Sequence, residues 1–261
     1  LCLAESGIPC TVLERGKPVE ERAADVETFW RTGVLRPDSN VQFGEGGAGT
    51  FSDAKLNTGT HDDRIAFVLE TFARFGAPED ILYLAAPHIG TDKLRAVVKN
   101  LRLRLLALGC DVRFEIKLEE LEIRDGAVRA AVVSHGGKQE RIETDTVILA
   151  PGNGARDTFR MLHAAGFPMS PKSFAVGVRI EHLQRDIDLA QYGAAATLGT
   201  LPASNYKLAV HTPEGRGVFT FCVCPGGAVV AASSEPGRLV TNGMSEYRRD
   251  GVNCNGGLLV S

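Results

Sequence analysis

The chain has little of what would indicate a membrane, a disulfide framework or a nucleic-acid surface. Six cysteines in 261 residues are too few for the dense disulfide network of small secreted proteins, so a reducing, cytoplasmic setting is expected. No apolar run approaches the roughly 18 residues that cross a bilayer. A net charge of -3 argues against a broad phosphate-binding surface. We therefore expect neither membrane nor nucleic-acid partners.

Motifs of several enzyme classes are also missing. The chain has no P-loop and no H-E-x-x-H sequence, and no Ser-His-Asp arrangement is legible. No metal site is expected. Glycine, in contrast, is abundant at 29 residues, many of them in clusters where strands are expected to end. Because glycine has no Cβ, the backbone can approach a ligand closely at such clusters.

The most informative segment is Thr11–Gly16, TVLERG, a short apolar strand that ends in Glu14. In a dinucleotide-binding βαβ unit, an acid at this place accepts hydrogen bonds from the adenosine ribose, about 20 residues after a glycine-rich phosphate loop. Residues 1–7 read as the last turns of a helix, which leaves no room for that loop. We expect the loop to precede residue 1, and residues 1–261 alone to bind such a cofactor poorly. An acid after an apolar strand is common, so Glu14 alone is weak evidence.

The hydrophobic pattern predicts an α/β part followed by a mostly β part. Helices are expected at 18–31, 64–75, 91–108 and 155–165. Short strands joined by Asp125-Gly126 and Gly136-Gly137 turns predict a meander over 111–143. The apolar segments 8–14 and 146–150 are expected to be strands of one parallel sheet. Later strands are expected at 174–181, 206–211, 218–223 and 228–232, so we place a domain boundary near residue 172.

Two glycine-rich loops are candidates for contact with a cofactor. The first is 40–56, NVQFGEGGAGTFSDAKL, whose candidate residues are Gly44, Gly46, Gly47, Gly49, Thr50 and Lys55. Its glycines can turn successive N–H groups toward an anion or a flavin edge, and the hydroxyl and the lysine add donors. The second is 145–156, DTVILAPGNGAR, where Ala150 and Gly152 close an apolar strand. The alternatives are a flexible surface loop and a plain strand-to-helix turn.

The pair Cys222 and Cys224 lies in TFCVCPGG, on an expected strand whose alternation points both thiols to one face. A redox dithiol usually reads C-x-x-C, and a metal site needs further ligands nearby. The pattern therefore favours two small buried side chains, with thiols placed beside a substrate as the alternative.

Together these segments resemble one protein family. The stretches VLERG, SNVQFGEGGAGTFSDAKL, GAPEDILYLAAPHIGTDKL, GARDTF, SFAVGVRIEH, TFCVCPGG and NGMS with RRDGVN are similar to the bacterial FAD-dependent dehydrogenase-like proteins, the NAD(FAD)-utilising dehydrogenases. Family members are longer at both ends. The resemblance implies a glutathione-reductase-like FAD-binding fold, incomplete over residues 1–172. A mainly antiparallel β-rich substrate or cap region would follow over 173–261.

The resemblance also implies a cofactor and its contacts. FAD is the implied cofactor, NAD(P)H a candidate electron donor, and a small molecule the substrate. Glu14, followed by Arg15, would bind the ribose, and Leu118 would contact adenine through its backbone. The 44–50 loop would face the flavin and pyrophosphate, and 150–152 would line the cofactor. Pro151 departs from the family pattern and cannot donate a backbone hydrogen bond.

Two function classes remain open at this point. A flavin oxidoreductase needs no dedicated acid or base when the isoalloxazine carries the hydride chemistry, which agrees with the absence of a catalytic constellation. A noncatalytic nucleotide-binding module on the same fold is the alternative, because fold does not fix function. A nicotinamide-only dehydrogenase is disfavoured, since a simple Rossmann domain has no meander at 111–143.

Overall fold

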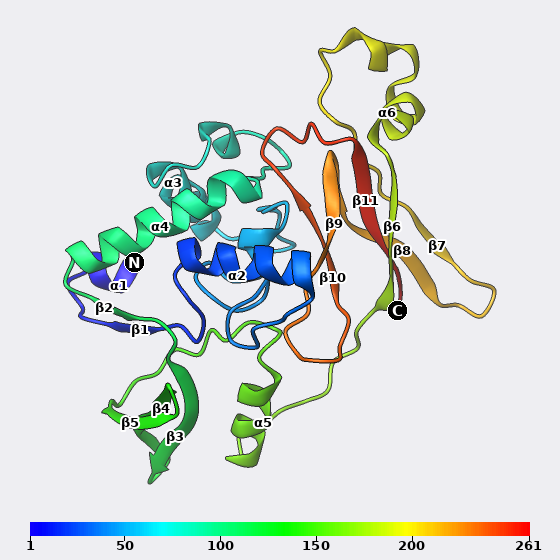
Figure 1. The fold of residues 1–261 in the computed structure, drawn as a ribbon. Helices are drawn as coiled ribbons and strands as arrows, with labels where there is room; N and C mark the ends of the chain where they lie inside the picture. Colours follow the sequence, from blue (N-terminus) through cyan, green and yellow to red (C-terminus); the bar gives the residue numbers. More distant parts are fainter. The chain divides into compact units, whose positions relative to one another are not determined.

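The computed structural model describes residues 1–261, which form two compact units assembled from separate chain segments (Figure 1). Unit 1 consists of Leu1–Gly47, Lys99–Pro171 and Ser233–Arg238. Unit 2 consists of Ala48–Val98, Lys172–Ala232 and Leu239–Ser261. The boundary near residue 172, inferred from the hydrophobic pattern, stays a prediction. No helix is both long and apolar enough to span a membrane.

Unit 1 combines short helices with a parallel strand pair and a meander. Its elements are α1 (Cys2–Glu5), β1 (Thr11–Leu13), α2 (Val19–Thr32), β2 (Asp111–Arg113), β3 (Lys117–Arg124), β4 (Ala127–His135), β5 (Lys138–Glu143) and α5 (Arg156–Ala164). Strands β1 and β2 pair in parallel, with Thr11 opposite Asp111. Helix α2 follows Pro18, whose fixed φ suits a helix start, and ends at Gly33 in the left-handed conformation.

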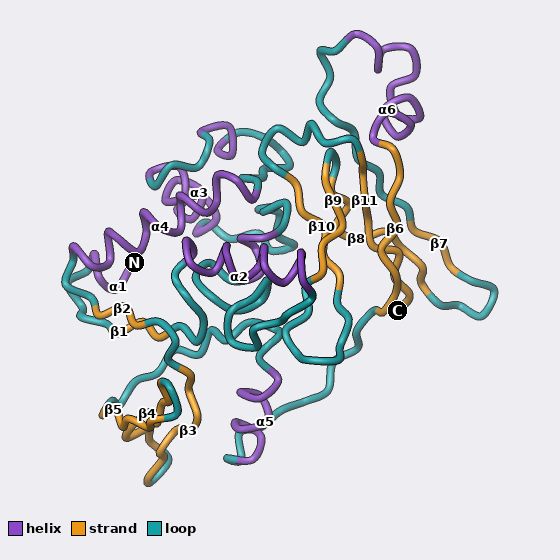
Figure 2. The backbone as a smooth tube through the Cα atoms, in the orientation of Figure 1, coloured by secondary structure: helices purple, strands orange, loops and turns teal.

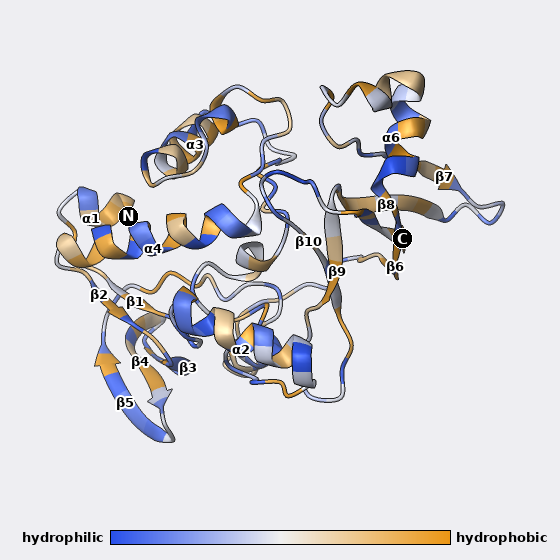
Figure 3. Cartoon of the chain, turned by 45° about the horizontal axis from the view of Figure 1, so that its top comes forward, coloured by the Kyte–Doolittle hydropathy of each residue, from blue (hydrophilic) through white to orange (hydrophobic).

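The meander agrees with the prediction for 111–143 from β3 onward. Strands β3, β4 and β5 form an antiparallel sheet in that order. The turns Asp125-Gly126 and Gly136-Gly137 have positive φ at both residues, as two-residue type I′ hairpins require. Figure 3 shows β5 as mainly hydrophilic, whereas Ala131 and Val133 of β4 belong to a small buried core. Leu118 packs against that core, which consists of Ile116, Leu121, Ala131, Val133 and Leu162.

Unit 2 is built on antiparallel strands, as expected for the region after residue 172. Its elements are η1 (Ala48–Phe51), α3 (Arg64–Arg74), η2 (Glu79–Leu82), β6 (Val176–Leu183), α6 (Gln184–Tyr192), η3 (Gly193–Leu198), β7 (Ala209–His211), β8 (Gly217–Cys224), β9 (Gly227–Ala231), β10 (Thr241–Ser245) and β11 (Asn253–Val260). Helix α4 (Thr91–Ala107) begins in this unit. Four strands pair in the order β6-β11-β8-β7, and β9 pairs with β10 (Figure 2).

Three parts of the pattern were interpreted incorrectly. Residues 146–150 form no strand, and Ile148 is 75% exposed. The reason is that β1 pairs only with β2, so no neighbouring strand accepts the backbone hydrogen bonds that would hold the segment extended in a sheet. The predicted first meander strand, 111–116, is shorter and joins β1 instead. Helix α6 and strands β10 and β11 were not predicted at all.

Candidate functional site

The predicted ribose acid, Glu14, lies directly after β1 at the carboxyl end of the strand. Its Oε1 accepts hydrogen bonds from the backbone N–H groups of Gly16, at 2.8 Å, and Gly44, at 3.0 Å. Its Oε2 makes no hydrogen bond to the protein, and the side chain is half-buried. One oxygen of this carboxylate therefore fixes the local backbone, while the other is available to a ligand.

Close backbone packing explains the glycine that ends the TVLERG segment. A Cβ on Gly16 would lie 2.5 Å from Gly44 Cα and 2.7 Å from the carbonyl oxygen of Asp38. Only glycine permits this approach, which brings the turn after β1 against the glycine-rich loop. The contact joins two of the sequence segments that were predicted to meet at the cofactor.

The buried side chain of Arg22, on α2, holds the glycine-rich loop in place. It is fully buried, and its guanidinium donates to five backbone carbonyls of the loop. These are the carbonyls of Asn40 at 2.8 Å, Val41 at 2.9 Å, Gly44 at 3.2 Å, Glu45 at 2.6 Å and Gly47 at 2.9 Å. Five donors in a planar fork are the full capacity of arginine, so a lysine could not replace it.

The loop is also tied to the start of α2. The carboxylate of Glu45 accepts from the N–H of Val19 at 2.8 Å and lies 3.3 Å from Arg102. Burial raises the pKa of Glu45, which the cap hydrogen bond and Arg102 oppose. A Cβ on Gly44 would lie 2.3 Å from Arg22 Cδ, so only glycine at this position leaves space for the Arg22 side chain. Residues 40–47 are thus held by many hydrogen bonds, which favours an ordered loop over the flexible-loop alternative.

A second ion pair fixes Arg15 beside the loop. Its guanidinium donates to both carboxylate oxygens of Asp157, at 3.0 and 2.7 Å, and stacks over the ring of Phe43 at 4.3 Å. The hydrogen bonds from Arg15 hold the pKa of Asp157 well below its usual range. Arg15 therefore orients the first residues of α5 toward the end of β1.

The remaining predicted residues lie in different surroundings. Leu118 belongs to the meander core, and Ala150 and Gly152 lie in the irregular segment before α5, Gly152 with φ of +74°. Gly46 and Gly47 continue the loop of unit 1, whereas Gly49, Thr50 and Lys55 belong to unit 2. Thr50 is fully buried, and its carbonyl accepts from Thr91 at 2.6 Å. The cofactor roles of all these residues stay predictions.

Lys55 lies in a charged cluster of unit 2 that the sequence did not indicate. Its ammonium is 2.7 Å from the buried carboxylate of Asp53, 3.5 Å from Cys224 Sγ and 3.9 Å from Cys222 Sγ. Burial lowers the pKa of Lys55, but Asp53 and the two thiols together raise it above its ordinary value. The Arg249 guanidinium also donates two hydrogen bonds to the Asp53 carboxylate, one to each oxygen.

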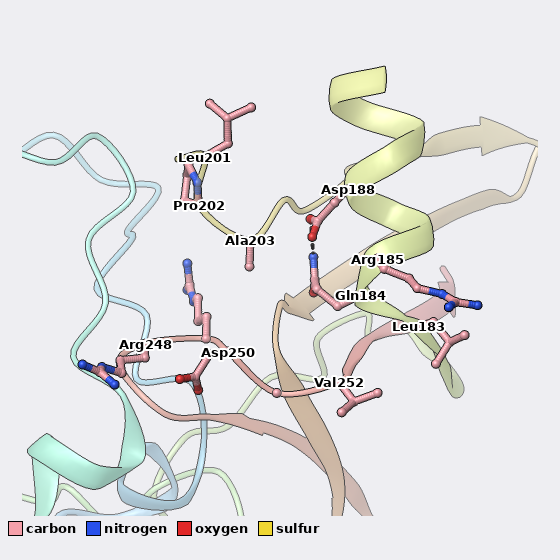
Figure 4. Close-up of a pocket in the computed structure, with 12 residues that line it drawn as sticks. Leu183, Gln184, Arg185, Asp188, Leu201, Pro202, Ala203, Arg248, Asp250 and Val252 are labelled. Atoms are coloured by element: carbon pink, nitrogen blue, oxygen red, sulfur yellow. Dashed lines mark hydrogen bonds between the residues drawn. The ribbon is translucent and has the colours of Figure 1, made fainter. Parts of the chain in front are cut away.

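A cleft of about 590 Å³ opens in the same unit (Figure 4). It is lined by the start of α6 and by residues 201–203 and 248–252. Asp188 accepts from Gln184 at 2.7 Å on its wall, as the dashed line in Figure 4 shows. Its lining mixes the charged side chains of Arg185, Arg248, Asp188 and Asp250 with apolar ones such as Leu201 and Val252, so it indicates no single class of ligand.

Two family models match the chain. Residues 47–177, half of the chain, match the FAD binding domain, and residues 173–261 match the C-terminal domain-like part of the FAD-dependent proteins.

The chain belongs to the FAD-dependent, dehydrogenase-like proteins.

Among relatives of this FAD-dependent protein, an uncharacterised protein of Clostridium beijerinckii is 47% identical over 262 residues. The match covers all of this chain and 48% of the relative, so the chain spans about half the length of that protein. A flavoprotein/dehydrogenase from Cytophaga hutchinsonii has a TM-score of 0.39 at 14% identity, over 97% of this chain and 56% of its own. BexE, studied for oxidation during BE-7585A biosynthesis, has a TM-score of 0.32 at 16% identity, covering 97% and 39%.

The residues around Glu14 fit the adenosine end of FAD. A carboxylate with one unbonded oxygen stands at the end of a parallel strand, which is where a dinucleotide ribose is held in such folds. The loop that contacts it has its carbonyls bound by Arg22 without any ligand. The geometry is compatible with a ribose at Oε2, and the role of Glu14 as its acceptor stays a prediction.

Sequence reasoning missed the two arginines that organise these sites. Arg22 sits among acidic residues on an amphipathic helix, where an arginine usually faces solvent. Arg249 lies about 200 residues from its partner Asp53. Gly44 was a usable signal for a crowded position, but nothing in the pattern identified Arg22 as the side chain that crowds it.

Proposed function

We propose that the complete natural protein is an FAD-dependent oxidoreductase acting on a small molecule, with Glu14 holding the adenosine ribose. The observation that carries the proposal is that only one oxygen of the Glu14 carboxylate is hydrogen-bonded to the protein. Oε1 binds the N–H groups of Gly16 and Gly44, and Oε2 is left to accept hydroxyl hydrogen bonds. The family match supports FAD as the ligand.

When bound, FAD would supply the isoalloxazine on which the hydride chemistry depends. The chain's own part, on this proposal, is to bind and orient. Glu14 fixes the ribose, and the loop 40–47 keeps its shape because Arg22 holds its carbonyls. The backbone of Leu118 contacts the adenine, and the segment 150–152 lines the cofactor. NAD(P)H is the proposed electron donor.

The binding half of the proposal is tested by two substitutions at Glu14 in the complete natural protein. Glu14→Ala should weaken FAD binding by about 1–3 kcal/mol, because ribose hydroxyls lose a charged acceptor. Glu14→Gln should weaken it less, since its carbonyl oxygen still accepts from Gly16 and Gly44. Both are measured by titrating apoprotein with FAD and following flavin fluorescence. Unchanged affinity in Glu14→Ala would remove Glu14 from the site.

The catalytic half is tested separately on the flavin-loaded protein. We expect anaerobic addition of NADH or NADPH to bleach the visible flavin absorption, and a turnover assay with a dye acceptor to follow. A protein that binds FAD stoichiometrically but is reduced by neither donor and by no candidate substrate would favour the noncatalytic module instead.

A further inference from the structure

Two thiols meet a lysine in unit 2, in a group called here the thiol cluster: Cys222, Cys224, Lys55, Asp53 and Arg179. Cys222 and Cys224 are on β8, Arg179 is on β6, and Asp53 and Lys55 follow η1. The Lys55 ammonium lies within 3.9 Å of both sulfurs. The Arg179 guanidinium donates to the carbonyl of Cys222 at 3.1 Å and to Asn255 at 2.7 Å.

The charges of the cluster favour a negative sulfur. Asp53, only 1% exposed, is held by both Lys55 and Arg249. Because Arg249 neutralises Asp53, the charge of Lys55 is left for the thiols, and Arg179 adds another positive charge. The pKa of Cys222 falls to about 5 through the hydrogen bond from Cys224, then through Lys55 and Arg179, although burial opposes the shift. Cys224 is the thiol of the pair, its pKa raised by Cys222 and by burial.

The backbone presents the two sulfurs unequally. Asn255 of β11 pairs with Cys224, and Gly257 pairs with Phe221, so β8 has a bulge at 222–223. Cys222 has φ of +47°, a strained left-handed conformation for a side chain with a Cβ. Cys222 is half-buried and Cys224 is buried. Cys222 is therefore the more exposed residue of the pair.

The neighbouring strand is shaped to cover this arrangement. At Gly243 of β10, a Cβ would lie 2.6 Å from Cys224 Sγ and 2.4 Å from Arg179 Nη1. The amide nitrogen of Asn255, a fully buried residue, makes no hydrogen bond. By contrast, Cys10 and Cys110 touch at 3.3 Å in unit 1, where the contact and burial raise the pKa of Cys10. Contact between two thiols therefore does not by itself lower a thiol pKa. The nearby Lys55 and Arg179 distinguish the thiol cluster from the Cys10–Cys110 pair.

We propose that Cys222 and Cys224 form a redox-active dithiol that reduces disulfides. The Cys222 thiolate attacks one sulfur of the substrate disulfide, the substrate S–S bond breaks, and the departing thiolate takes a proton from solvent. The Cys224 sulfur then attacks Cys222, the bond to the substrate breaks, and the Cys224 proton passes to the second departing sulfur. The dithiol loses two electrons and the disulfide gains two. The reaction needs no flavin and so extends beyond the proposed function.

The first experiment measures the reactivity of Cys222 in the complete natural protein against pH. The tryptic peptide 217–238 contains these two cysteines and no others, so iodoacetamide labelling is read on it by mass spectrometry. We expect the rate to rise with a midpoint near pH 5 and to level off by neutral pH. At pH 6 it should exceed the rate in the urea-unfolded chain about tenfold, because roughly 300-fold more thiolate is offset by roughly 40-fold lower intrinsic nucleophilicity.

Substitutions at Lys55 test whether the thiol cluster causes the low midpoint of the Cys222 labelling profile. Lys55→Met should move the midpoint upward by more than one pH unit, and Lys55→Arg should restore most of the shift. A wild-type midpoint equal to that of the unfolded chain would overturn the proposal without any variant being needed.

The second experiment tests the dithiol with oxidised glutathione as the probe. In the wild type, peptide 217–238 should lose two hydrogen atoms while two glutathione thiols are released. Cys224→Ser should stop at a glutathione adduct on Cys222, and Cys222→Ser should form neither product. Cys254→Ser is the matched control, because Cys254 is buried on β11 with its pKa raised to about 11, and it should behave as wild type. A reactive Cys222 that never forms the bond to Cys224 would also overturn the proposal.

Discussion

Replacing Arg22 with methionine removes the one side chain that satisfies the inner carbonyls of the 40–47 loop. Methionine replaces the apolar stem of arginine but has no guanidinium and none of its five donors. A hydrogen bond from a charged donor contributes about 1.5–3 kcal/mol. Five such bonds at the low end of that range sum to roughly 7.5 kcal/mol, which is comparable to the whole stability of many domains, about 5–15 kcal/mol.

A loss of that full size is not expected, because the loop can open and let water bind its carbonyls. We therefore expect the free energy of unfolding to fall by about 3–5 kcal/mol, the range for removing one partner of a buried charged interaction. The rest of the perturbation should appear as local opening. The backbone N–H groups of Glu45 and Gly47, which donate to Lys17 and Gly44, should lose most of their protection from hydrogen exchange.

The assay combines urea unfolding with hydrogen exchange read by mass spectrometry on peptides that cover residues 36–47. Arg22→Lys keeps the charge but has one donor nitrogen, so it should lie between wild type and Arg22→Met. Glu21→Gln, at the exposed neighbouring position, should change neither quantity. If Arg22→Met stays within 1 kcal/mol of wild type and the loop remains protected, the loop is held by something other than this guanidinium.

Three further outcomes are expected. Gly16→Ala should lower Tm by several degrees, because its Cβ would lie 2.5 Å from Gly44 Cα and the backbone must move apart; an unchanged Tm would contradict this. Gly47→Val and Gly109→Val both place a Cβ at an open positive-φ position, so each should lower the free energy of unfolding by about 1–2 kcal/mol. Only Gly47→Val should also lower the flavin content. Equal flavin losses in the two variants would mean that Gly47 serves only the turn. Asp157→Asn should cost about 1 kcal/mol at pH 7, since the carboxylate is partly exposed. Because the folded pKa of Asp157 is depressed, that difference should shrink as the pH falls below the usual aspartate pKa and disappear only below the folded pKa, so urea titrations should show a smaller difference at pH 3 than at pH 7.

Local chemistry made the meander and most helices predictable. Asp125-Gly126 specifies a two-residue hairpin whatever surrounds it, because few residues tolerate φ above zero at both central positions. Helix α2 follows from apolar spacing between Pro18 and Gly33. In both cases the determinant lies within a few residues of the element that it specifies.

The failures share a different cause, which is dependence on distant partners. Strand β11 reads NCNGGLLV, a poor strand former, yet it is fixed by hydrogen bonds to β6 and β8 on its two sides. The segment 146–150 reads as a buried strand but has no strand beside it. At the sites, Glu14 and the loop 40–47 were recognisable, whereas Lys55 reaches Cys222 across 167 positions. Hydrophobic periodicity along a sequence does not predict contact between residues so far apart.

The place of β11 in its sheet has a consequence for how the chain folds during synthesis. It separates β6 from β8, so neither of those strands has its main partner until about residue 260 has left the ribosome. Until then β6 carries an unpaired edge, with Val176 and Val178 each more than 60% exposed even in the finished fold. Long waits with open apolar edges favour mispairing with other chains. Expression at reduced temperature, or with chaperones that shield strand edges, should therefore raise the yield of folded protein more than stabilising substitutions in unit 1 would.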